Sequence, residues 1–179
     1  GPVLLEIPGD VAVEELDEVE FDYDTPVPVR TAADPDAVAR AATVLLAAER
    51  PLIQAGQGVL YSEASQELRA VAEFLQAPVM TTLLGKSAFP ETHPLSVGSG
   101  GTSTTGGVHK YMMGADMVFG VGCSFTRANT AVPIPAGKTI IHSTNNHEDI
   151  NKDIKCRYPL VGDAKLVLSQ PTNHMDFCS

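Results

Sequence analysis

Residues 51–58 read Pro-Leu-Ile-Gln-Ala-Gly-Gln-Gly, a mostly apolar run that ends in two closely spaced glycines. Such a run is typical of a buried strand that leads directly into a tight turn. Comparable apolar runs recur at 78–82, 117–121, 139–142 and 158–161, and helical patterns lie between them. Apolar strands that alternate with helices predict a mostly parallel sheet covered by helices on both faces.

Capping residues indicate where the helices begin. Residues 34–36 read Asp-Pro-Asp, an N-cap aspartate followed by proline at the first helical position, and they predict a helix that runs to about Ala48. Ser62 is expected to cap a second helix with one apolar face. Two further helices are expected, one over 108–113 and one that begins at Ala164.

The length of the chain favours a single domain with additional terminal segments. Its 179 residues, of which 44% are hydrophobic, are enough for one full core. We predict a linker over 12–33, where an acidic stretch is followed by alternating prolines. A central nucleotide-binding-like domain is expected over 34–170, and a tail over 171–179 that frays. Within the domain, residues 83–107 are rich in Gly, Ser and Thr and are predicted to form a long loop.

Composition excludes several classes of partner. The net charge of −10, from 12 basic and 22 acidic residues, argues against nucleic acid and against an anionic membrane, because both require a basic surface. The three cysteines are widely spaced, which favours reduced thiols and a cytoplasmic protein over a disulfide framework or a zinc site. The histidines lack metal-ligand spacing, and His142, at the end of a strand, is expected to be structural.

Several blocks of sequence, in this order, resemble one family. They are similar to the central domain of thiamine diphosphate-dependent enzymes of the acetolactate synthase, pyruvate decarboxylase and oxalyl-CoA decarboxylase type. Residues 1–11 are similar to the end of the pyrimidine-binding domain that precedes it, although Gly1-Pro2 could instead be a remnant of protease cleavage. The blocks that carry the resemblance are Arg-Pro-Leu-Ile-Gln-Ala-Gly-Gln-Gly (50–58), Ala-Pro-Val-Met-Thr-Thr (77–82), Ala-Asp-Met-Val-Phe-Gly-Val-Gly (115–122) and Gly-Asp-Ala-Lys (162–165).

The resemblance implies a Rossmann-like three-layer α/β domain with about six parallel strands. In this family, thiamine diphosphate and Mg²⁺ are held by the pyrimidine- and diphosphate-binding domains of the same chain. The activating glutamate belongs to the first of these and a Gly-Asp-Gly metal motif to the other. Neither can be assigned in this sequence, so we expect no catalytic residue here and no activity of this fragment alone. The parent is expected to be a lyase or transferase that forms a homo-oligomer.

The candidate ligand residues in the first half of the domain follow two predicted strands. Gly56-Gln57-Gly58 could bring backbone amides close to a phosphate, but Tyr61 replaces the third glycine of a dinucleotide fingerprint. A purely structural turn is the alternative. Thr82, Leu83 and Gly85 belong to a segment that, in flavin-bearing members, lies along the cofactor. Lys86 is either a phosphate ligand or a solvated surface group.

The second half contributes candidates that depart from the flavin-bearing pattern. Those relatives usually carry arginine at the position of Gly122, and Arg127 is a candidate to replace it. Thr144 and Asn146 take the places of two family acids whose carboxylates are suited to accept hydrogen bonds from ribose hydroxyls. Threonine and asparagine make this interaction less strongly, which argues against tight binding of FAD or NAD. Asp163 is either a ligand or the cap of the helix that begins at Ala164.

The leading interpretation is therefore a central domain fragment of an acetolactate synthase-like 2-oxo acid decarboxylase or carboligase. We expect it to be structural and to have ADP or FAD as candidate ligands. A stand-alone nucleotide-binding module and an NAD-dependent enzyme with the same sheet topology are alternatives. A pure scaffold domain without a ligand fits the sequence nearly as well.

Overall fold

The computed structural model describes residues 3–15, 23–101, 103–128 and 131–175, and for 171–175 it describes the backbone only. Gly1-Pro2, most of the acidic stretch and the last four residues lie outside this part. The described chain forms one six-stranded sheet with the order β3-β2-β1-β4-β5-β6, and every neighbouring pair is parallel. The predicted α/β fold is confirmed. The strands are β1 (Pro51–Ala55), β2 (Val79–Thr82), β3 (Ser96–Gly100), β4 (Met117–Val121), β5 (Thr139–Thr144) and β6 (Tyr158–Val161).

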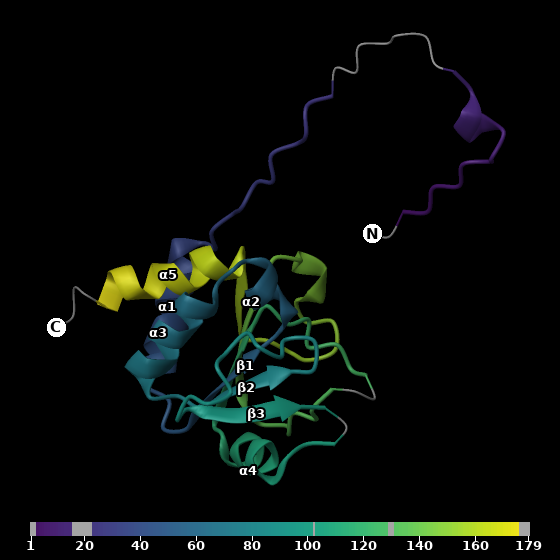
Figure 1. The fold of residues 1–179 in the computed structure, drawn as a ribbon. Coiled ribbons are helices and arrows are strands. Elements are labelled where there is room, and N and C mark those ends of the chain that lie inside the picture. The colour runs from purple at the N-terminus through teal and green to yellow at the C-terminus, as the bar shows by residue number, and fades with distance from the viewer. Residues whose placement is uncertain (1–2, 16–22, 102, 129–130, 176–179) are drawn as a thin grey trace.

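Helices cover the two faces of the sheet unequally. Ile53 of β1 packs into an apolar cluster with α1, α3 and α5, whereas its neighbour Leu52 packs with α4 on the opposite face. Figure 1 shows α1, α3 and α5 together on one side of the sheet and α4 on the other. The predicted three-layer arrangement is therefore present. The helices are α1 (Pro35–Leu46), α2 (Gln57–Tyr61), α3 (Ser65–Leu75), α4 (Gly106–Gly114) and α5 (Ala164–Met175).

The first helix begins where its capping residues predict. The Asp34 carboxylate accepts a hydrogen bond from the Asp36 amide at 3.1 Å, and Pro35 occupies the first turn. The prediction that Ser62 caps the next helix is wrong. The chain enters α2 immediately after the Gly56 turn, and Ser62 ends that helix. Glu63, with φ of 54°, then separates α2 from α3.

The predicted loop over 83–107 contains a strand that its amino-acid composition does not indicate. Residues 96–100 read Ser-Val-Gly-Ser-Gly, with neither the apolar run nor the alternation expected of a strand, yet they form β3 at the edge of the sheet. The Thr81 and Ser99 hydroxyls are 2.8 Å apart and join β2 to β3. Hydrogen bonding to β2 therefore outweighs the weak strand propensity of β3.

Residues on both sides of the predicted domain contact it or continue its helices. At the start, the last residues of the predicted linker already contact the domain: Ala33 is buried, and its backbone exchanges two hydrogen bonds with the Gln170 side chain. At the other end, α5 continues to Met175, through the first residues of the predicted tail. Within the described residues, no helix is long and apolar enough to cross a membrane.

Candidate functional site

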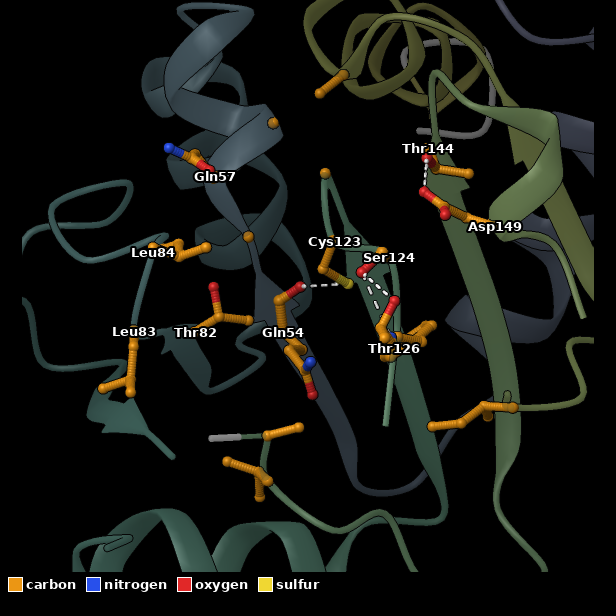
Figure 2. Close-up of a pocket in the computed structure, with 18 of the residues that line it drawn as sticks. Gln54, Gln57, Thr82, Leu83, Leu84, Cys123, Ser124, Thr126, Thr144 and Asp149 are labelled. Atoms are coloured by element: carbon orange, nitrogen blue, oxygen red, sulfur yellow. Dashed lines mark hydrogen bonds between the residues drawn. The ribbon is translucent and has the colours of Figure 1, made fainter. Parts of the chain in front are cut away.

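A cavity opens where the sheet reverses its winding direction. From β1 the chain moves outward through β2 to β3, and from β4 it moves the opposite way to β6, so β1 and β4 flank the switch point. Parallel α/β sheets bind ligands beyond the carboxyl ends of the strands at such a point. The cavity there has a volume of about 830 Å³, within the range of small-molecule sites. Figure 2 shows the side chains around it.

The cavity brings together most of the ligand residues predicted from the sequence. Gly85 and Asn146 are the two exceptions and do not line it. The others come from the ends of five different strands or from the turns that follow them, and these meet at one edge of the sheet. The predicted residues that line the cavity are Gly56, Gln57, Gly58, Thr82, Leu83, Gly122, Arg127, Thr144 and Asp163.

The glycines at the switch point allow two turns to pack directly against each other. A Cβ atom on Gly122 would lie 2.6 Å from the Val59 nitrogen, and φ of Gly122 is 59°, in the region that favours glycine. The amide of Gly56 donates to Val121 and that of Gly58 to Gly122, each at 2.8 Å. These two amides are therefore already bonded, which supports the structural interpretation of this turn over direct phosphate binding.

Only part of the segment that follows β2 lines the cavity, and the rest of it packs behind the end of β1. Gly85 lies behind the end of β1, where a Cβ atom would be 2.6 Å from the Ala55 carbonyl oxygen. Its amide donates to the Thr82 hydroxyl at 3.0 Å, which closes a tight turn. Lys86 pairs with Glu91 at 3.6 Å, and both side chains are more than half exposed. Lys86 is therefore a surface group, the second of its two predicted alternatives.

A carboxylate that sequence reasoning missed lies at the end of β5. The Thr144 hydroxyl donates to Asp149 at 3.4 Å, and Asp149 lines the cavity. Figure 2 shows the two side chains facing each other. Asn146, one of the predicted ligands, instead caps the short helix His147–Asp149 by accepting from the Glu148 amide at 3.1 Å. That cap reverses the direction of the chain, so Asp149, five residues after Thr144, lies beside the end of β5.

The two remaining charged candidates have well-defined surroundings. The Arg127 amide donates to the Asp153 carboxylate at 2.8 Å, and the exposed Arg127 side chain lies at the cavity. Asp163 accepts from the Lys165 and Leu166 amides at 3.0 and 3.3 Å, so it caps α5. Asp163 also lies 3.9 Å from the Arg30 side chain. The cap interpretation of Asp163 is therefore correct, although its carboxylate still borders the cavity.

The buried titratable groups beside the cavity favour their neutral forms. Burial raises the pKa of the Cys123 thiol to about 12, so at neutral pH it is not a nucleophilic thiolate. Burial also lowers the pKa of His142, although its hydrogen bond to the Cys123 carbonyl opposes that shift. Cys123 and Cys156 are both free thiols. Among the residues that the structure describes, no three His, Cys, Asp or Glu side chains could together hold a metal ion.

Known proteins agree with this architecture. The family model for the thiamine pyrophosphate enzyme central domain matches residues 38–170. The probable acetolactate synthase large subunit of Methanocaldococcus jannaschii is 37% identical over 176 residues, which are 94% of this chain and 30% of that protein. Glyoxylate carboligase of Escherichia coli O157:H7 is 35% identical over 178 residues, 94% of this chain and 29% of that protein.

A solved structure shows the same fold. Benzoylformate decarboxylase from Polynucleobacter necessarius superposes with a TM-score of 0.71 at 28% identity, over 92% of this chain and 31% of that one. The chain therefore belongs to the thiamine pyrophosphate enzyme family. The part of that family it matches is the central domain, as its sequence predicted. It spans about 30% of the length of these relatives.

Proposed function

We propose that this chain is the central domain of an acetolactate synthase-like 2-oxo acid decarboxylase or carboligase, and that it binds ADP or FAD in the cavity. The family match and two relatives, a probable acetolactate synthase large subunit and a glyoxylate carboligase, support this proposal. In the whole protein, a lyase or transferase, thiamine diphosphate and Mg²⁺ would be held by the pyrimidine- and diphosphate-binding domains, in a homo-oligomer. The described residues offer no cluster of metal ligands, so we place no step of thiamine chemistry on this chain.

The observation that carries the ligand proposal is the polar end of the cavity. Asp149 presents a carboxylate beside the Thr144 hydroxyl, and a carboxylate at a strand end is suited to accept hydrogen bonds from a ribose diol. Arg127 supplies a guanidinium group at the cavity, and guanidinium recognises phosphate oxygens in pairs. Together they match a nucleoside that carries a diphosphate.

Calorimetric titration of the 179-residue chain with ADP, and separately with FAD, tests this proposal. We expect saturable binding that Asp149→Ala weakens about tenfold or more, because hydrogen bonds to charged groups contribute about 1.5–3 kcal/mol. Glu148→Ala is the matched control, since Glu148 is exposed and lies outside the cavity lining. Equal affinity of the Asp149 variant and the parent chain would contradict this use of the cavity.

A scaffold domain without a ligand is the second candidate function. The observation that favours it is that the amides of Gly56, Gly58 and Gly122 all donate to backbone carbonyls. On this view the switch point serves packing alone, and neither ADP nor FAD gives a binding signal. For both candidates the isolated chain, supplied with thiamine diphosphate and Mg²⁺, should release no CO₂ from a 2-oxo acid; measurable release would contradict both.

A further inference from the structure

The last strand of the sheet, β6, has one edge without a partner strand among the described residues. The sheet order ends at β6, and Gly162 donates to the Thr144 carbonyl of β5 at 2.9 Å. In a strand the backbone groups of successive residues point to opposite sides, so Val161 and Pro159 direct theirs to the open edge. Because proline lacks an N–H, this edge offers the N–H of Val161 and the carbonyls of both residues.

The chain before α1 already makes the first contact of a parallel ladder with this edge. The Asp163 amide donates to the Thr31 carbonyl at 2.8 Å, and Asp163 points to the same side as Val161, two residues earlier. The Arg30 guanidinium holds this point in place, because it donates to the Ser62 carbonyl at 3.2 Å and lies 3.9 Å from Asp163. Thr31 is therefore fixed at the carboxyl end of β6, where a parallel strand beside it would end.

The sequence before Thr31 has the alternation that such a strand requires. Residues 25–31 read Thr-Pro-Val-Pro-Val-Arg-Thr. Since Thr31 points its carbonyl to β6, Val29 and Val27 would point their backbone groups to β6 as well, and both prolines would point away. In an edge strand, proline is tolerated where its missing N–H would face solvent. Both prolines occupy such positions, and each favours an extended conformation in the residue before it.

This pairing is open in the structure. Val27 and Val29 are 85% and 88% exposed, and Figure 1 shows the N-terminal segment leading away from the sheet. Closing it would add a hydrogen bond from the Val161 amide to Val29 and one from the Thr31 amide to Val161. The Val29 amide would donate to Pro159. These hydrogen bonds are opposed by the entropy lost on ordering about five residues, so the open and closed states are close in free energy.

Charge favours the same closed arrangement. The loop before β6 carries three exposed cations, and none of them forms an ion pair within the described part of the chain. They are Lys152, Lys155 and Arg157. In the closed register Asp24, the last residue of the acidic stretch, would lie beside this loop, where opposite charges attract each other.

We propose that residues 27–31 are a strap that closes on the edge of β6 as a seventh parallel strand of the same chain. When the strap is open, the preceding residues leave the domain at the carboxyl end of β6, which is the end where the cavity lies. When it is closed, they leave at the opposite end of the sheet. The strap therefore decides at which end of the sheet the N-terminal segment is held, whether or not the cavity binds a ligand.

Disulfide trapping in the 179-residue chain tests the register. Pro28→Cys with Pro159→Cys places two cysteines directly opposite each other in the closed strap. Their Cα atoms would be about 4.8 Å apart, within the range that a disulfide spans. Pro28→Cys with Val161→Cys is the matched control, because its cysteines would be two residues out of register and about 8 Å apart, beyond that range.

The rates of the two pairs distinguish a strap from a free linker. Both pairs are made with Cys156→Ala and Cys178→Ala, whereas Cys123 is buried and is kept. Oxidised glutathione is the oxidant, and mass spectrometry after alkylation measures the rate. We expect the 28–159 disulfide to form at least about tenfold faster than the 28–161 disulfide. A free linker predicts the reverse order, because position 161 is nearer to the Thr31 anchor and closes a shorter loop.

Proline substitutions test the hydrogen bonds of the strap. Val29→Pro removes the N–H that would donate to Pro159 and should slow the 28–159 disulfide about threefold or more. Val27→Pro is the control, because Arg157, the next residue along β6, is bonded to Ile140 on the other side. Its rate should change less than about twofold. Both valines are exposed, so the reduced variants should keep the urea midpoint of the parent chain.

Three results would overturn the strap. Equal rates for the two cysteine pairs, or faster formation of the 28–161 disulfide, would show a free linker. Disulfides between two chains would assign the edge of β6 to a second copy of this chain. Equal slowing by Val29→Pro and Val27→Pro, or slowing by neither, would show that the proposed register does not form.

Discussion

His142 shows how one buried side chain makes stability depend on pH. Its Nε2 atom lies 2.6 Å from the Cys123 carbonyl oxygen, so this nitrogen donates, and Nδ1 is buried without a partner. Burial lowers the pKa of His142 below the ordinary value of 6.5. Between the two pKa values the unfolded chain binds a proton that the folded chain does not. Stability is therefore lost as pH falls through 6.5 toward the lowered pKa.

We expect the urea midpoint of the chain to fall between about pH 7.5 and about pH 5.5 through the titration of His142. His142→Gln cannot titrate in this range, so its midpoint should depend less on pH. His109→Gln removes an exposed histidine and should behave like the parent chain. The role of His142 is refuted if the His142 and His109 variants show the same pH dependence.

At the scale of the element, α5 depends on the residue that precedes it. Asp163 accepts hydrogen bonds from the Lys165 and Leu166 amides, which otherwise lack partners in the first turn. Asp163→Ala should lower the free energy of unfolding by about 0.5–2 kcal/mol. Asp163→Asn keeps the cap and loses only the partly exposed pairing with Arg30, so we expect a change of at most about 0.5 kcal/mol.

Urea denaturation of the two Asp163 variants measures this difference. An equal loss of stability in both variants would argue against the cap. Titration of Asp163→Asn with ADP adds a second readout, because a loss of affinity without a loss of stability would identify Asp163 as the ligand residue that the sequence also predicts.

For the whole molecule, we expect the boundary of the domain to lie inside the predicted linker. Every described side chain from Val3 to Val29 is exposed, and Figure 1 shows the N-terminal segment extending away from the sheet. By contrast, the Thr31 carbonyl accepts from the Asp163 amide at 2.8 Å, and Ala33 is joined to Gln170. The last part of the predicted linker therefore contacts the fold.

Two truncations test this boundary by urea denaturation. Deletion of residues 1–29 should change the free energy of unfolding by less than about 0.5 kcal/mol, because it removes exposed side chains. Deletion of residues 1–33 should lower it by about 3 kcal/mol, since it also removes hydrogen bonds that contribute about 1 kcal/mol each. Similar stability of the two truncated chains would place the boundary further along the sequence.

Local chemistry explains which parts of the fold could be predicted. The start of α1 depends on Asp34 and Pro35, neighbours in the sequence, and was predicted correctly. The apolar residues of β1, β4 and β5 indicate by themselves that these strands are buried. The edge strand β3 lacks that signal because its structure depends on β2, a partner that its own composition does not specify.

The α/β class, the family resemblance and most of the residues around the cavity could be predicted from the residues alone, because each strand and the turn after it are contiguous in the chain. Only the tertiary structure brought Asp149 back to Thr144, bonded the glycine amides to a neighbouring turn, and left Gln54 without a partner. Each of these depends on which groups meet across the sheet. Hydrogen bonds act over about 3 Å in space, whereas a sequence pattern records only separation along the chain.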